Sequence, residues 1–310
     1  MELFSALPQS FALILPLDEV MWRFIGYMGS FGIFGALGFR FILLSSSFGS
    51  ADSVAPLSSF PLVCHTAQKG AATVGLLGAC LVIGSSAWAA AVRAQMAQIG
   101  LVESARRMGP QFLYKIVLAA LLVAAFAIAR RGPRHAWRGA AILGSALALK
   151  KIIDAKWVAL LGPLHELGAS LWLGTLCVLL IVGLPAIFLG AVPGGQRGPL
   201  VAELVARFSR LALFAAGLLG ITGIVLSWTH LKYLAALWTT PYGYVLDVKL
   251  LIVSVVVALG AWNWKRITPK LKEGDAVNAL QRSVKVELGF AAIVVLLSTI
   301  LVMLPTPSLP

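Results

Sequence analysis

The sequence predicts an all-α membrane protein, a polytopic bundle of about eight transmembrane helices. Of its 310 residues, 59% are apolar and 12% are charged, and the mean hydropathy is +0.91. A soluble domain carries roughly 25% charged residues, so this chain could not cover its own surface in water. The alternation of period two that is typical of a membrane β-barrel does not occur.

Apolar runs that end at charged residues, proline or glycine predict where the helices lie. A helix needs about 20 residues to span a bilayer, and most of the eight runs reach that length. The runs are Met21–Leu44, Leu62–Val92, Phe112–Ala129, Ala136–Ile153, Ala159–Leu189, Leu204–Leu231, Tyr244–Trp264 and Ser283–Leu304. The fourth run is the weakest, because its uninterrupted apolar part is Gly139–Leu149. Arg138 and Lys150 would then have to reach the interface or face protein.

The basic residues predict the orientation. With eight spans both termini share a side, and 15 of the 25 Lys and Arg residues fall in or beside the connections that follow odd-numbered spans. These are Arg40, Lys69, Arg130, Arg131, Arg134, Arg138, Arg197, Arg207, Arg210, Lys265, Arg266, Lys270, Lys272, Arg282 and Lys285. The positive-inside rule puts these connections in the cytoplasm and both termini in the periplasm. Because the charges are spread over connections, they do not indicate nucleic-acid binding.

Two halves of the chain, residues 1–158 and 159–310, look like copies of each other. Val74–Gly78 (VGLLG) resembles Ala216–Gly220 (AGLLG), Gly29 and Gly35 match Gly168 and Gly174, and Pro110–Lys115 resembles Pro241–Lys249. The shared order favours a four-plus-four repeat with parallel topology. Glycines recur at every third position in the first span (Gly26 to Gly38) and in the sixth (Gly217 to Gly223). Such stripes predict close helix packing.

Polar side chains inside the spans are candidates for function, because an ionisable group costs roughly 2.5 kcal/mol or more at the membrane centre. They are His165, Glu166, His230, Asp247, Lys249 and Glu287. All except Glu287 lie towards the predicted outer face, and we expect them to converge on one level of the membrane. Glu287 lies near the inner boundary, where pairing with a basic residue is the plainest explanation.

Methionines and histidines on the outer side indicate copper. Met21, Met28, Met96, Met108 and Met303 all map there, and thioether and imidazole groups suit copper. We predict His165, His230, Met28 and Met303 as metal ligands. The cysteines Cys64, Cys80 and Cys177 lack the spacing of a disulfide framework or zinc site.

Five segments resemble the copper resistance protein D (CopD/PcoD) family. They are Leu164–Leu176 (LHELGASLWLGTL), Arg207–Leu231, Thr239–Ile252 (TTPYGYVLDVKLLI), Asn263–Pro269 and Arg282–Gly289 (RSVKVELG). The resemblance implies that His165 is the family's histidine, that Trp172 and Gly174 form its tryptophan-glycine motif, and that Lys249 and Glu287 are its intramembrane polar positions. Trp228, Tyr242 and Gly243 lie in matching segments and support the assignment. It also implies an inner-membrane protein that receives copper from a periplasmic carrier of the CopC type.

Two alternatives stay open. His165 and His230 could be the two axial ligands of haem b between the fifth and sixth spans, as in a membrane cytochrome, or the chain could be a scaffold for cuproenzyme assembly. No P-loop is present, and no residues indicate an enzyme. The leading hypothesis is a copper transporter or importer that is not driven by nucleotide hydrolysis.

Overall fold

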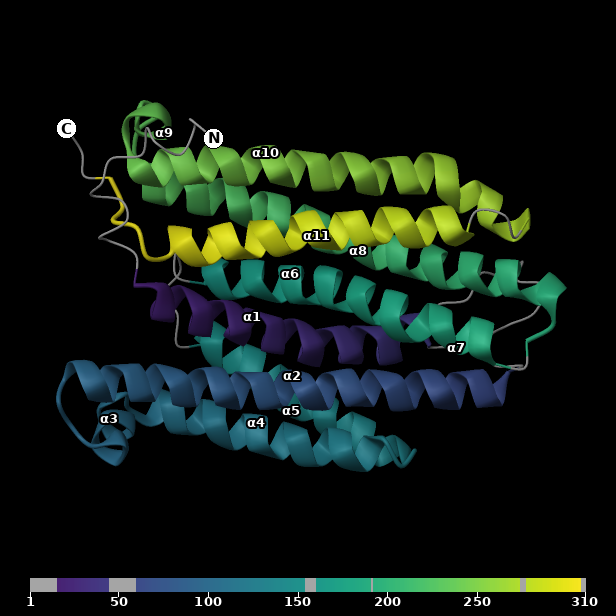
Figure 1. The fold of residues 1–310 in the computed structure, drawn as a ribbon, viewed down its shortest axis with the longest axis horizontal. Coiled ribbons are helices and arrows are strands. Elements are labelled where there is room, and N and C mark those ends of the chain that lie inside the picture. Colours follow the sequence, from purple (N-terminus) through teal and green to yellow (C-terminus); the bar gives the residue numbers. More distant parts are fainter. Residues whose placement is uncertain (1–15, 45–59, 154–159, 191, 274–276, 308–310) are drawn as a thin grey trace.

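The computed structural model confirms the predicted all-helical membrane bundle (Figure 1). It describes residues 16–44, 60–153, 160–190, 192–273 and 277–307, and no strand occurs among them. In these ranges, seven helical segments are long and apolar enough to cross a membrane. The chain is therefore a multi-pass membrane protein. The predicted start of the fifth span at Ala159, and the boundary between the two halves, lie outside the described residues.

The long helices follow the predicted order and mostly extend past the predicted bounds. The elements of the first half are α1 (Leu17–Gly38), η1 (Phe39–Leu43), α2 (Pro61–Met96), α3 (Leu101–Arg107), α4 (Pro110–Ala129) and α5 (Arg134–Ile153). Those of the second half are α6 (Leu161–Val178), η4 (Leu179–Gly183), α7 (Leu184–Leu189), α8 (Gly194–Leu231), α9 (Ala236–Thr239), α10 (Pro241–Trp262), η5 (Asn263–Ile267), η6 (Thr268–Glu273) and α11 (Val277–Leu301). Proline opens α2, α4 and α10, where its missing N–H costs nothing.

Helix α5 is the weak fourth span of the sequence prediction, and it is not among the seven apolar segments. Arg134 and Arg138 are exposed on it, while Trp137 is fully buried. It nevertheless returns the chain from the end of α4 to the start of α6: α4 and α6 point the same way, and α5 runs back between them (Figure 1). As a result, α1 begins and α11 ends at one end of the bundle, together with α3 and α9. We call this the α3/α9 end and the opposite one the α7 end.

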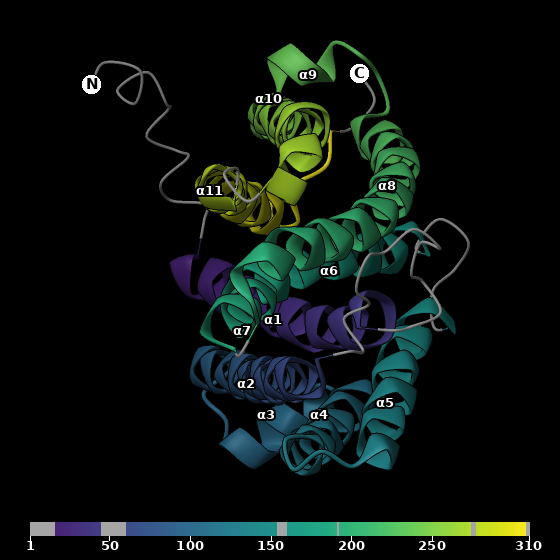
Figure 2. The same ribbon diagram turned by 90° about the vertical axis from the view of Figure 1, so that its right-hand side faces the viewer.

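The centre of the bundle is a parallel contact between α1 and α6, which lie side by side in Figure 2. A Cβ atom added at Gly35 would come within 2.3 Å of the Gly174 backbone, and one added at Gly29 within 2.8 Å of Gly78 on α2. The glycine stripe of the first span therefore packs helices backbone to backbone, as predicted. Gly35 and Gly174 are equivalent positions of the proposed repeat.

Replacing Gly35 with alanine is expected to destabilise the bundle, because the new methyl group has no space against Gly174. Overpacking of this kind costs about 1–3 kcal/mol, so the midpoint of thermal unfolding in detergent should fall. Gly84→Ala on α2 is the control, since nothing lies within 4 Å of its added Cβ. Equal unfolding midpoints for the two variants would contradict the contact.

Other features agree with two similar halves, although the repeat itself stays a prediction. Both α1 and α6 pass into π-helical segments, η1 and η4, and a short helix (α3 or α9) precedes the third long helix of each half. The halves differ at the second helix of each. Gly75 on α2 packs against the ring of Phe126 on α4, whereas nothing lies within 4 Å of a Cβ added at Gly217 or Gly220 on α8. The predicted close packing along α8 is therefore wrong at these two glycines.

Candidate functional site

The first turns of α6 carry the strongest candidate, His165. Its helix lies between α1 and α8, and its imidazole lies against Gly223, where an added Cβ would come within 3.3 Å of Cε1. The glycine therefore gives the ring room to approach α8. The Nδ1 atom of His165 is 2.9 Å from the hydroxyl oxygen of Thr222, a buried residue that the sequence analysis did not select.

Hydrogen bonds at Thr222 favour one tautomer of His165. The Thr222 hydroxyl donates its one hydrogen to the carbonyl of Leu218, at 2.6 Å. It can therefore only accept from the imidazole, so Nδ1 carries the proton. The lone pair of the neutral ring is then on Nε2. A histidine whose other nitrogen donates to a fixed acceptor is the usual form of a metal ligand.

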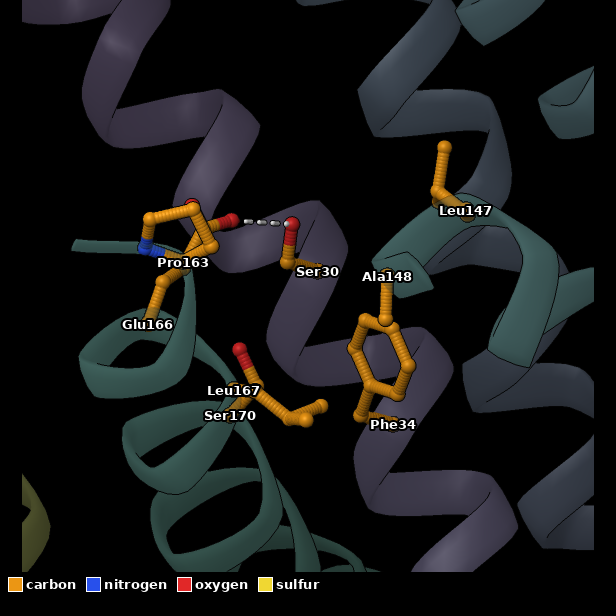
Figure 3. Close-up of a pocket in the computed structure, with 8 residues that line it drawn as sticks. All are labelled: Ser30, Phe34, Leu147, Ala148, Pro163, Glu166, Leu167 and Ser170. Atoms are coloured by element: carbon orange, nitrogen blue, oxygen red, sulfur yellow. Dashed lines mark hydrogen bonds between the residues drawn. The ribbon is translucent and has the colours of Figure 1, made fainter. Parts of the chain in front are cut away.

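Glu166 points to a different helix, because adjacent residues of an α-helix lie about 100° apart. Its carboxylate accepts a hydrogen bond of 3.2 Å from Ser30 on α1 (Figure 3). Both residues line a cavity of about 10 Å³ with Ser170, enough for about one water molecule. The Ser170 hydroxyl is fully buried and has no hydrogen-bond partner among the described residues. His165 and Glu166 therefore take part in separate polar contacts.

Lys249 and Asp247 on α10 were predicted to join this level of the membrane. Lys249 is half-buried and is among the charged groups that act on His165 electrostatically. Asp247 is exposed. When protonated, Lys249 would oppose the approach of a second cation to His165.

His230 lies too far along α8 to share a site with His165, so the expected convergence of the two histidines is wrong. Eight residues separate it from Thr222, which is about 12 Å of helix. Its Nδ1 donates to the Leu226 carbonyl at 2.7 Å, and its ring stacks on Tyr242, with centroids 6.1 Å apart. The two imidazoles do not face each other, so the geometry gives no support to a bis-histidine haem.

That Met28 and Met303 are copper ligands stays a prediction. Met28 packs with Tyr27, Phe31 and Trp172 against Leu173 and α11, and Met303 is half-buried just after α11. Within the described ranges, no group of three or more His, Cys, Asp or Glu side chains could hold a metal ion. Any copper held by His165 would therefore need neutral co-ligands or few ligands, as Cu(I) accepts.

Glu287 has a partner that the sequence analysis missed. Its carboxylate accepts from the amide of Asn263 in η5, at 3.3 Å, and the glutamate is 4% exposed. A second buried carboxylate, Glu203, pairs with Arg207 one turn further along α8. Asn263 and Glu203 could have been selected from the sequence, because each is a polar residue within or beside an apolar run.

The motif residues have structural roles. Gly174 forms the α1 contact, and a Cβ at Gly243 would come within 2.1 Å of the Ala236 carbonyl, so the turn from α9 into α10 requires glycine. Thr240 caps α10 by accepting from the N–H of Gly243. Trp228 is 61% exposed, as suits an interfacial tryptophan.

Comparison with known families finds a match within the second half of the chain. Residues 202–301 match the family model for copper resistance protein D (CopD). No curated protein and no solved structure matches the chain. The match includes Thr222, His230, Lys249 and Glu287, and it begins after α6, so His165 and Glu166 lie outside it.

Proposed function

We propose that the chain transports copper across the bacterial inner membrane and that His165 accepts the ion. The chain is a multi-pass membrane protein, and its residues 202–301 match the copper resistance protein D family. The observation that carries this proposal is the bond from His165 to Thr222. This bond leaves the Nε2 atom of His165 without a proton, at the contact between α6 and α8. The acceptor Thr222 lies inside the CopD match, which links His165 to the matched region.

Copper reaches His165 from the α3/α9 end, which faces the periplasm in the proposed orientation. The positive-inside rule supports this, since basic residues such as Arg197, Lys265 and Arg266 lie towards the α7 end. A separate periplasmic carrier of the CopC type delivers the ion. The ion also binds transiently on the periplasmic side, at Met28, Met303 and His230. It is released to the cytoplasm past α11.

Metal analysis and an absorption spectrum of one purified preparation test the proposal. We expect about one copper per chain after loading with Cu(I), and no Soret band. Stoichiometric haem would contradict copper transport through His165, and so would protein that binds no copper. Protein loaded with Zn(II) is the control for nonspecific binding to surface carboxylates.

Lys249→Met is expected to tighten copper binding by about tenfold, because removal of a nearby positive charge removes its repulsion of the bound ion. Affinity is measured by competition with a coloured Cu(I) chelator. Lys265→Met is the matched control, since Lys265 is exposed in η5 near the α7 end. Unchanged or weaker binding in the Lys249 variant would show that the ammonium does not act on the ion.

A further inference from the structure

A cavity of about 610 Å³ lies among α6, α8, α10 and α11, away from the His165 site. Its volume is in the range of sites for small organic ligands, about 300–1,000 Å³. In the first half, α2 packs directly on α4 through Gly75 and Phe126. In the second half, the corresponding space beside α8 is open, and Ala216 forms part of its wall.

Most of the wall is apolar, and the mouth is too. Leu176, Leu179 and Leu184 line the interior and are buried. At the edge, Leu213 is 78% exposed and Trp264 is 68% exposed. In a chain that spans the membrane, such side chains face lipid, so the cavity opens sideways to acyl chains.

One end of the cavity is polar and rich in hydrogen-bond acceptors. Glu203, Asn263 and Glu287 line it. The side chain of Glu203 is 9% exposed, and the residues Asn263 and Glu287 are 7% and 4% exposed. The Oε2 atom of Glu203 and the Oδ1 atom of Asn263 have no hydrogen-bond partner among the described residues. Arg207 compensates the charge of Glu203, whereas Glu287 accepts its hydrogen bond from the neutral amide of Asn263. Buried acceptors of this kind require a donor, and an ionised Glu287 would favour one that is positively charged.

The cavity is polar towards the α7 end and apolar towards the middle of the bundle, which is the order of headgroup and acyl chain in a lipid of the leaflet at the α7 end. This polar end, which Arg207 and Arg210 also line, lies on the side of the α7 end, where η5 brings Lys265 and Arg266. The apolar wall extends from there towards the middle of the bundle. We infer that the cavity binds a phospholipid of the ethanolamine type, with its ammonium group at Glu287, Asn263 and Glu203, its phosphate near Arg210, and an acyl chain along α8.

Native mass spectrometry of the full chain tests this inference. The protein is extracted in mild detergent from membranes that contain both phosphatidylethanolamine and phosphatidylglycerol. We expect one bound phosphatidylethanolamine and preferential retention of that lipid. Glu287→Gln should lower its retention by about tenfold, because a hydrogen bond to a charged group is lost.

Two further variants keep the test independent of folding. Ala216→Phe fills the cavity from its wall and should displace the lipid while the CD spectrum and unfolding midpoint stay near those of the wild type. Glu103→Gln, on exposed α3, is the charge-matched control and should retain the lipid. The inference is overturned by protein without phospholipid, by a bound quinone in its place, by equal retention of both lipids, or by retention that the Glu287 and Ala216 variants leave unchanged.

Discussion

Replacement of His165 by alanine is expected to remove copper binding from the purified protein while the helical content stays that of the wild type. The imidazole is held by Thr222 in the tautomer that presents Nε2, and no group of three or more His, Cys, Asp or Glu side chains in the described ranges could hold the ion instead. Loss of this one ligand therefore leaves too few donors. Copper per chain, measured after loading and desalting, checks the prediction.

Two matched variants show whether the loss is specific. Thr222→Val removes the acceptor that orients the imidazole and should weaken copper binding by about 10–100-fold without abolishing it. His135→Ala removes an exposed histidine of α5 and should change nothing. Copper stoichiometry that is unchanged in His165→Ala would refute the assignment.

Replacement of Arg207 by alanine is expected to lower the free energy of unfolding by about 3–5 kcal/mol. Arg207 is 4% exposed, pairs with Glu203 and donates to the carbonyl of Leu43, at 2.7 Å, where the first span ends. Removing it leaves a buried carboxylate without its counter-charge and a helix end without its donor. Unfolding in mixed micelles of increasing SDS content measures the change.

The double variant Glu203→Gln with Arg207→Met should recover much of this stability, because no buried charge is left. Arg107→Ala is the surface control: its pair with Glu103 is exposed, and such pairs contribute about 0–1 kcal/mol. An Arg207→Ala variant as stable as the Arg107 control would contradict a structural role for the buried pair.

The sequence predicts the helices well because their signal is local. Apolar runs, prolines at helix starts and the glycine stripe of α1 each act within one helix or on its nearest neighbour. Helix α5 is uncertain for the same reason: Arg134 and Arg138 lower its hydropathy, although it connects the end of α4 to the start of α6. The stripe on α8 has the same pattern as that on α1, and only three-dimensional packing distinguishes them.

The site is predictable in part. His165 is identifiable as an intramembrane histidine, but its partner Thr222 depends on the register between α6 and α8, which no local pattern specifies. The depth of His230 is misjudged because α8 has 38 residues and extends well beyond its contact with His165. The large cavity is also beyond sequence reasoning, since it arises from helices that fail to pack together.

Copper flux into proteoliposomes tests the central claim most directly. The purified chain is reconstituted into vesicles that contain a coloured Cu(I) chelator, and Cu(I) is added outside without nucleotide. We predict uptake above that of protein-free vesicles for the wild type and for His135→Ala, and uptake at the protein-free level for His165→Ala. No uptake by the wild type, or equal uptake by the His165 variant, would contradict copper transport through His165.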